Sequence, residues 1–383
     1  MNSLLFSPFQ VGQVKLPNRI VVAPMCQYSA NDGCANDWHL MHLMQLAVSG
    51  AGLIVLEATA VERHARITHG CLGLYNDVNE AALVRVMSSA RAVSPAGTRW
   101  GIQLGHAGRK ASAQRSWEGR GALGARESPW ETEAPSEISF ADGWHTPREM
   151  TKQDIDRVRN AFVEAALRAA RAGFDVVEIH AAHGYLLHQF LSPLANHRVD
   201  EYGGSLENRA RFPLEVARAV REALPPNVAF GFRITGTDWR PDGITIDEAV
   251  VLADALKSVG VDYVCVASGG VAPASIPVQA GYQVHLAAEV KERTGIVTRT
   301  VGMIADSHQA ESVLTSGQAD LVALARAFID DPRWPWHAAE ALGDLEALGD
   351  LEEIKYPGQY ERGGAVHWPG AALRRNGVEQ VAS

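Results

Sequence analysis

The sequence predicts a single (β/α)8 TIM barrel, with a long lid inserted after the third strand and a C-terminal extension. Short apolar runs recur along the chain, each is followed by a loop and a helical pattern, and there are eight of them. Continuous apolar strands that alternate with helices are typical of a parallel sheet covered on both faces, and eight such units favour a closed barrel. The eight runs are Ile20–Ala23, Leu53–Leu56, Trp100–Leu104, Val176–His180, Ala229–Ile234, Tyr263–Ala267, Val297–Val301 and Leu321–Ala325.

A doubly wound parallel sheet is the alternative that has the same alternation of strands and helices. In that fold a Gly-x-Gly-x-x-Gly turn commonly follows a strand and binds a dinucleotide. No such motif follows any of the eight runs. A dinucleotide site of that kind is therefore unsupported.

Capping residues and apolar periodicity mark the helices between the strands. Residues Thr151 to Asp154 resemble a capping box, with Asp in the place of Glu. Apolar residues at helical spacing follow this box, and Gly173 ends the helix just before the strand that begins at Val176. A later helix is predicted to begin after Thr245 in the same way.

Two segments depart from the plain repeat, and they set the predicted domain organisation. Residues 1–340 form the barrel, and residues 105–150 within it form a long insertion rich in Gly, Pro, Trp and Ser. A loop of this length is usually functional, so we expect a lid over the C-terminal ends of the strands. Residues 341–383 form the extension, where Leu-Gly-Asp-Leu-Glu occurs twice; we expect a solvated segment that could lie at a subunit interface.

Composition narrows the class of protein. The chain has 383 residues, 46% of them hydrophobic, and a net charge of −9 without a basic stripe, which argues against nucleic acid as a partner. Its four cysteines are scattered, as in proteins of a reducing compartment. The N-terminus lacks the features of a signal peptide, and no apolar run is long enough to cross a bilayer. We therefore expect a cytoplasmic protein without a membrane partner.

The stretch from Val176 to Pro193 concentrates polar chemistry at the end of the fourth strand. It places His180, His183 and Tyr185 within six residues, and a tight turn would bring both imidazoles to one side. The His-x-x-His spacing could serve a metal, although a zinc site needs a third ligand. From this stretch alone, organic catalysis and a structural role are equally favoured, and metal binding ranks third.

The other strand ends supply an anion-binding pattern. The loops after strands seven and eight of such barrels often bind phosphate. There, Gly302 allows close backbone approach and Arg326 offers a planar guanidinium that suits phosphate oxygens. Gln103 and Arg233 follow from strands three and five. Together with the two histidines and the tyrosine, this set suits a phosphorylated, planar cofactor better than a metal, so we predict no metal site.

Four motifs follow one another in fixed order along the chain. They are Ala23-Pro24-Met25-Cys26-Gln27-Tyr28, Gly101 to Lys110, Glu178 to Tyr185, and Asn196 to Arg209. These motifs resemble the old yellow enzymes, which are FMN-dependent ene-reductases built on a (β/α)8 barrel. The resemblance covers about Leu5 to Pro335 and returns at Tyr360–Gly363. The pair Cys26 and Tyr28, with Tyr-Glu-Arg-Gly near the end, is similar to the thermophilic-like subclass.

The resemblance implies a role for each matching residue. His180 and His183 would hold the carbonyl or nitro oxygen of the substrate, Tyr185 would donate a proton, and Tyr28 would help to bind the substrate. Cys26 would tune the flavin, and Arg362 would reach the active site of a neighbouring subunit. The residues implied to bind FMN are Ala23, Pro24, Met25, Cys26, Ala60, Gln103, Arg233, Gly302, Ala325 and Arg326.

The implied activity is the NAD(P)H-dependent reduction of activated C=C bonds of α,β-unsaturated carbonyl or nitro compounds. The family implies non-covalent FMN, a ping-pong hydride transfer, NADPH as the preferred reductant, and a homodimer or homotetramer. Two alternatives from other classes remain. One is a metal-dependent TIM-barrel hydrolase that uses His180 and His183, and the other is a flavin-binding protein without turnover.

Overall fold

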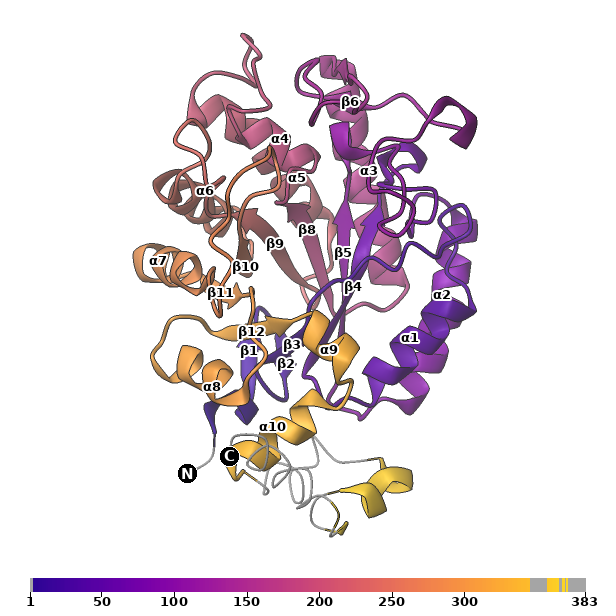
Figure 1. Cartoon of the computed structure of the whole chain (residues 1–383), viewed down its shortest axis with the longest axis vertical. Helices are drawn as coiled ribbons and strands as arrows, with labels where there is room; N and C mark the ends of the chain where they lie inside the picture. The colour runs from indigo at the N-terminus through magenta and orange to yellow at the C-terminus, as the bar shows by residue number, and fades with distance from the viewer. Residues whose placement is uncertain (1–2, 345–356, 365–366, 369, 371–383) are drawn as a thin grey trace, which may run out of the picture.

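A computed structural model describes residues 3–344, 357–364, 367–368 and 370 (Figure 1). It confirms the predicted (β/α)8 barrel. Eight parallel strands close in the order β10-β11-β12-β3-β4-β5-β8-β9, so each strand pairs with its neighbours in the barrel sequence. The barrel strands are β3 (Ile20–Val22), β4 (Leu53–Ala60), β5 (Arg99–Gly105), β8 (Val176–Ala181), β9 (Ala229–Thr235), β10 (Tyr263–Ala267), β11 (Val297–Thr300) and β12 (Leu321–Leu324).

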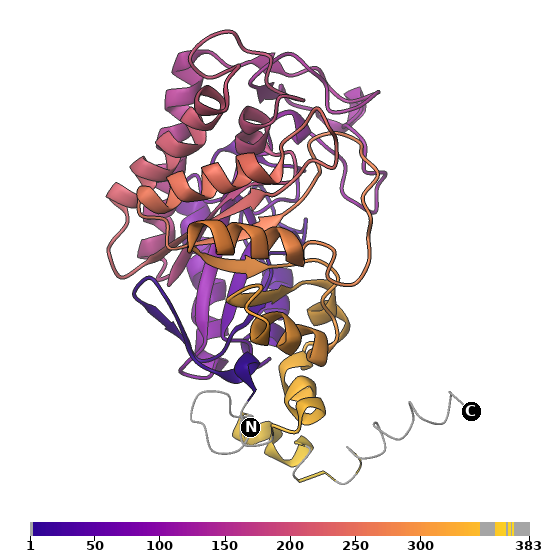
Figure 2. The same ribbon diagram turned by 90° about the vertical axis from the view of Figure 1, so that its left-hand side faces the viewer.

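Helices surround the strands, as both views show (Figures 1 and 2). Their apolar sides and the outer faces of the strands share one continuous buried core. Among the described residues, every helix is too short or too polar to span a bilayer. The helices are α1 (Asp37–Ala47), α2 (Asp77–Val93), α3 (Lys152–Arg171), α4 (Leu186–Leu191), α5 (Leu206–Ala223), α6 (Ile246–Ser258), α7 (Val284–Thr294), α8 (Ser307–Thr315), α9 (Arg326–Asp330) and α10 (Trp334–Leu342).

Local sequence signals fix several of these helix ends. Thr151 caps α3: its hydroxyl accepts from the Asp154 amide, while the Asp154 carboxylate accepts from the Thr151 amide, as the predicted capping box requires. Thr245 and Glu248 make the same reciprocal pair at the start of α6. These caps satisfy amide groups that the first helical turn leaves without partners.

A short antiparallel hairpin, β1 (Phe9–Val11) and β2 (Val14–Leu16), packs its apolar side chains with those that point into the barrel. The barrel interior is therefore a filled core. At one level this core is polar, because Glu178 and Arg299 lie inside it fully buried. Gly231 makes room at this level: a Cβ there would lie 2.1 Å from the ring of Tyr263.

The insertion between β5 and α3 carries its own small structure. It contains short 3-10 turns at Gly108–Lys110 and Ala125–Glu127 and a two-stranded parallel pair, β6 (Glu133–Ala134) with β7 (Arg148–Glu149). Figure 1 shows this segment at the end of the molecule opposite α10. Of the repeated acidic segment in the extension, only residues 342–344 belong to the described part of the chain, at the end of α10.

Candidate active site

A cavity of about 430 Å³ opens at the C-terminal ends of the barrel strands, which is where barrels of this type carry their chemistry. Residues from all eight barrel strands or the loops that follow them line it. The residues of the predicted site that line this cavity are Ala23, Pro24, Cys26, Gln103, His180, His183, Tyr185, Arg233, Gly302, Ala325 and Arg326.

Three predicted residues lie beside this cavity rather than in its lining. Met25 packs against the hydrophobic core. Ala60 lines a smaller neighbouring pocket, which it shares with His180 and Tyr185. Tyr28 interacts with the Cys26 thiol and stacks edge-on against Trp117, with ring centroids 6.2 Å apart. The predicted site is therefore one connected region with the cavity at its centre.

The end of β8 brings His180, His183 and Tyr185 together as the sequence predicts. The rings of His180 and His183 are nearly perpendicular with centroids 5.1 Å apart, and the ring of Tyr185 lies 4.9 Å from that of His180. His183 adopts a left-handed backbone conformation, with φ of 56°, which costs an L-residue roughly 1–2 kcal/mol. This strained turn directs two imidazoles and a phenol toward one space.

The two histidines are neutral and not equivalent. Burial and the nearby Arg233 guanidinium lower the pKa of both well below the ordinary value. Nδ1 of His180 accepts from the Ala182 amide at 3.3 Å, so its proton lies on Nε2, which faces His183 Nδ1 at 3.3 Å. The Nε2–H group of His183 is then left to donate to an acceptor in the cavity.

Gln103 presents a defined side of its amide to the cavity. Its Nε2 donates to Oε1 of Glu178 at 2.8 Å, while Oε2 of Glu178 accepts from the Tyr263 hydroxyl at 2.8 Å and pairs with Arg299. A carboxylate can only accept in these contacts. The side-chain amide of Gln103 therefore cannot flip. Its Oε1 is the atom that can accept a hydrogen bond from a ligand.

Arg233 supplies a positive charge that has no ion-pair partner within the described part of the chain. It lies on β9 beside His180 in the sheet register, and its Nε is buried without a hydrogen-bond partner among the described residues. A buried donor of this kind calls for an acceptor from outside the chain. The site therefore fits an anionic or carbonyl-bearing ligand at this point.

The loops after β11 and β12 line part of the cavity. Gly302 has φ of 110°, and a Cβ there would lie 2.5 Å from Nε2 of Gln283, so only glycine fits this close approach. Ala325 has a negative φ of −114°, outside the left-handed region that favours glycine. Arg326 follows it and lines the same cavity. This geometry suits the phosphate end of a ligand.

Cys26 and Tyr28 sit on a loop that a buried carboxylate holds in place. The Gln27 amide donates to Glu57 at 3.0 Å, and Tyr28 has a left-handed φ of 48°. Burial, and then the charge of Glu57, raises the pKa of the Cys26 thiol. Burial also raises the pKa of Tyr28. Both groups therefore keep their protons at neutral pH.

Sequence reasoning missed several residues that shape the site. Lys110, in the third strand's motif, donates to the backbone oxygens of His183 at 2.8 Å and Gly270 at 3.0 Å. Burial, and then the charge of Arg109, lowers its pKa to about 8. Gln283 and Ser268 hydrogen-bond each other at 2.7 Å in the cavity wall. Position within the Gly-Arg-Lys motif was the one available signal for Lys110.

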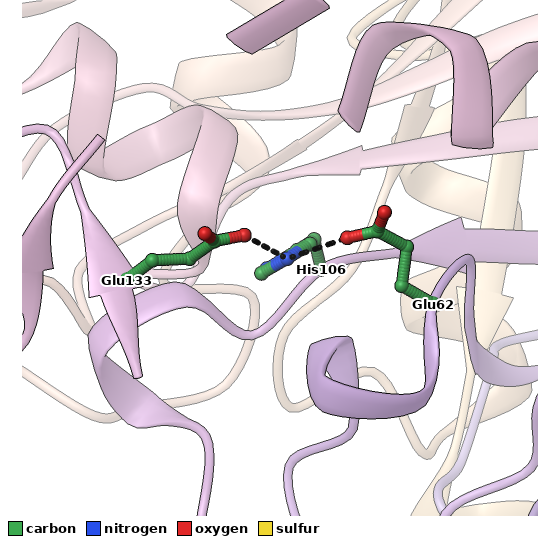
Figure 3. A group of neighbouring side chains, drawn as sticks. All are labelled: Glu62, His106 and Glu133. Carbon is green, nitrogen blue, oxygen red and sulfur yellow. Dashed lines mark ion pairs between the residues drawn. The ribbon is translucent and has the colours of Figure 1, made fainter. Parts of the chain in front are cut away.

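A further buried histidine, His106, lies between the carboxylates of Glu62 and Glu133 where the insertion begins (Figure 3). Its Nε2 is 3.7 Å from Glu62 and 3.2 Å from Glu133, and Arg157 pairs with both carboxylates. Burial alone would raise the pKa of Glu62, but His106 and Arg157 lower it to about 2. Burial would likewise lower the pKa of His106, and the two carboxylates raise it.

This cluster has the donor types of a metal site but not the electrostatics of one. Nδ1 of His106 accepts from the Gly108 amide at 3.0 Å, so the neutral imidazole carries its proton on Nε2, toward the carboxylates. The guanidinium of Arg157 pairs with both carboxylates and already offsets one of their two negative charges. A metal would have to displace both. The cluster is better described as a group of ion pairs that joins the insertion to α3.

The hydrolase alternative gains no support from this geometry. In the described part of the chain, the one group of three potential ligands is Glu62, His106 and Glu133, which excludes His180 and His183. The latter two face cations and each other. A divalent metal there would be placed beside Arg233 and Lys110 without a carboxylate.

Known proteins match this chain over nearly its whole length. Residues 4–344 match the model of the NADH:flavin oxidoreductase / NADH oxidase family. An NADPH dehydrogenase of Geobacillus thermodenitrificans is 44% identical over 365 residues, which cover 95% of this chain and 99% of that protein. An NADH:flavin oxidoreductase of Gibberella zeae is 45% identical over 347 residues, which cover 86% of this chain and 83% of that protein.

Solved structures also match the fold of this chain. Morphinone reductase superposes with a TM-score of 0.74 at 30% identity and covers 93% of this chain and 96% of its own. A complex of 2-naphthoyl-CoA reductase superposes with a TM-score of 0.79 at 25% identity, covering 88% of this chain, which spans about half (52%) of that protein. The resemblance to the old yellow enzymes is thereby confirmed, and the chain belongs to the NADH:flavin oxidoreductase / NADH oxidase family.

Proposed function

We propose that this protein is an FMN-dependent NAD(P)H oxidoreductase that reduces activated C=C bonds of α,β-unsaturated carbonyl or nitro compounds. The observation that carries the proposal is one cavity with two kinds of wall. One wall suits a phosphorylated planar ring and contains Gln103, Arg233, Gly302 and Arg326. The other wall suits an oxygen-bearing substrate and contains His180, His183 and Tyr185. Family membership supports the same reading.

The residues present fit FMN. The volume of about 430 Å³ lies within the roughly 300–1,000 Å³ of ligand pockets. The unpartnered Nε of Arg233 would meet a carbonyl, the acceptor oxygen of Gln103 would meet a ring N–H, and Arg326 would meet phosphate. Bound FMN would supply the hydride acceptor and donor of the ping-pong cycle. The residues proposed to hold it are Ala23, Pro24, Met25, Cys26, Ala60, Gln103, Arg233, Gly302, Ala325 and Arg326.

The opposite wall would act on the substrate. Reduction of an enone places negative charge on its carbonyl oxygen, and an aimed N–H donor stabilises that charge more than it stabilises the ground state. His183, with its proton fixed on Nε2, is the primary donor, and His180 supports it. Burial raises the pKa of Tyr185, so this phenol stays protonated and can hand its proton to the substrate carbon. Tyr28 would help to bind the substrate.

Three further predictions extend the proposal. The insertion over residues 105–150 would control access to the cavity of a barrel that spans residues 1–340. NADPH would be the preferred reductant. The chain would form a homodimer or homotetramer, in which Arg362 reaches a neighbouring site. In support, Arg362 is exposed on the turn Gly358–Gly363, whose Tyr360 packs its ring 5.0 Å from the Arg333 guanidinium.

The visible spectrum under anaerobic conditions tests the function. The purified protein should be yellow, NADPH should bleach it, and cyclohexenone should restore the colour. Steady NADPH consumption with the enone separates an enzyme from a flavin-binding protein without turnover. A colourless protein that neither binds FMN nor oxidises NADPH would refute the proposal.

A further inference from the structure

His188, on α4 and outside the cavity lining, is part of a buried chain of polar contacts. Its side chain is fully buried, as is that of Asp238. Nδ1 of His188 accepts from the Gly184 amide at 2.7 Å, and Nε2 lies 3.0 Å from Oδ1 of Asp238. The other oxygen of Asp238 accepts from Ser192 Oγ at 2.7 Å and from the Ile244 amide at 2.9 Å.

Nε2 of His188 and Oδ1 of Asp238 face each other, and no other residue that the structure describes offers either atom a partner. Both atoms are buried, and leaving both unpaired would be costly. Burial alone would raise the pKa of Asp238, but the adjacent His188 and the two bonds to its other oxygen lower it, which keeps an acceptor opposite Nε2.

Two neighbours of the imidazole specify the same tautomer, and the third, the Thr235 hydroxyl at 3.3 Å from Nδ1, can donate to that bare nitrogen as well. A carboxylate only accepts, so Nε2 carries the proton; an amide N–H only donates, so Nδ1 must be bare. Asp238 therefore determines, through His188, that the Gly184 amide has an acceptor. Asp238 lies 50 residues after His188 in the chain, on the loop that follows β9.

Gly184 is the hinge of the strained turn. It separates His183 from Tyr185, has φ of 73°, and follows a histidine that is itself left-handed. A Cβ on it would lie 2.1 Å from the backbone oxygen of Gly270. Lys110 holds the His183 oxygen, and Gln189 donates to the Gly184 oxygen at 2.7 Å. The hydrogen bond from the Gly184 amide to Nδ1 of His188 completes this set of side-chain contacts on the turn.

We infer that His188 and Asp238 are positioning residues: they hold the His183–Tyr185 turn in its left-handed form and so aim the oxygen-binding imidazole and the phenol. Neither residue lines the cavity. The consequence for catalysis rests on the proposed function, whereas the consequence for the turn does not.

The replacement Asp238→Asn separates positioning from bulk stability. The Asn oxygen must stay toward Ser192 and the Ile244 amide, so its NH2 group faces His188 Nε2. The imidazole then carries its proton on Nδ1, and two donors oppose each other at Gly184. We expect the ¹⁵N shifts of the His188 ring to report the exchanged tautomer and the Gly184 amide to exchange faster with solvent. We expect the Kd for p-hydroxybenzaldehyde, measured by calorimetry, to rise about tenfold.

Two variants at position 188 and a matched control complete the test. His188→Gln keeps an acceptor for Gly184 and a donor for Asp238, so it should retain phenol affinity within about threefold, whereas His188→Leu should lose about tenfold. Asp175→Asn makes the same chemical change where a carboxylate accepts the Trp100 amide at 2.8 Å, at the other end of the barrel, and should leave phenol affinity unchanged.

Each outcome decides between positioning and general destabilisation. Unchanged phenol affinity in Asp238→Asn despite an exchanged tautomer would overturn the inference. Equal losses in His188→Gln and His188→Leu would also overturn it. If the unmodified protein neither binds the phenol nor oxidises NADPH, the proposed function fails instead. The Gly184 exchange rate then still tests the hold on the turn, and an unchanged rate in Asp238→Asn would overturn that part.

Discussion

Two histidine sites lie at the ends of neighbouring strands and have opposite electrostatic surroundings. His180 and His183, at the end of β8, face Arg233 and Lys110, and their pKa values fall. His106, after β5, lies between two carboxylates, and its pKa rises. Both sites are buried, so burial alone does not distinguish them. The charges around them do: cations beside the first site disfavour protonated imidazoles, whereas carboxylates beside the second site favour one.

The largest effect should follow loss of the free imidazole donor. His183→Ala removes the Nε2–H group, and removal of one such donor typically lowers the rate by about 10²–10³-fold. We expect kcat/KM for an enone to fall to that extent, with weaker binding of phenols. His180→Ala should weaken phenol binding as well, through loss of the imidazole that orients His183. Unchanged phenol affinity in both variants would contradict an oxygen-binding role.

Tyr185→Phe should have the next largest effect. The side chain keeps its packing against His180 but loses its proton, and general-acid catalysis typically contributes about 10² or more. Enone reduction should slow by that factor, while reduction of the flavin by NADPH should be spared. Stopped-flow measurement of the two half-reactions checks this, and equal slowing of both would argue against a proton-donor role.

Acid titration of stability should separate the two histidine sites. The pKa values of His180 and His183 are lowered, so their contribution is present above the unfolded value of about 6.5 and is lost as pH falls below it. The Glu62 pKa of about 2 instead gives a contribution of up to about 3 kcal/mol, present above about 4.3 and lost as pH falls toward 2.

Urea unfolding as a function of pH measures both contributions. His183→Asn should flatten the slope between about pH 6.5 and 5, and Glu62→Gln should flatten it between about pH 4.3 and 2. The reverse assignment of the two pH ranges, or no change in either, would contradict the electrostatic contrast.

The smallest effect on stability should come from Arg362, which belongs to neither histidine site of its own chain. Its exposed side chain predicts a change within about 0.5 kcal/mol in the free energy of unfolding for Arg362→Ala. The KM for an enone should nevertheless rise if the side chain reaches a neighbouring site. Light scattering establishes the oligomer, and an unchanged KM in an oligomeric protein would contradict that contact.

The sequence predicted the barrel well because its signals are local. Apolar runs mark buried parallel strands, and Thr151 and Thr245 start their helices through contacts three residues away. The site was predicted largely because strand ends converge in a barrel, so His180, Arg233 and Gly302 meet without any need to know their side-chain directions.

What the sequence could not reveal depends on partners distant in the chain. Glu178 reads as one more residue of a buried strand, yet it orients Gln103, 75 residues earlier. No local sequence signal marks His188, because the role of its imidazole depends on its contact with Asp238. Burial, and then cations from two other strand ends, lowers the pKa of His180 and His183 and keeps them neutral. Periodicity reports which face of an element is buried, not which charges it meets there.

The left-handed backbone at His183 also restricts what evolution or an engineer can place there. Of the ordinary residues, Asn, Asp and His tolerate this conformation best, while β-branched side chains are strongly disfavoured. Among them, Asn alone pairs a neutral side chain with an N–H donor at every pH. A saturation library at position 183 should therefore recover active clones chiefly as Asn. The range of substitutions that this position tolerates is much narrower than the twenty amino acids.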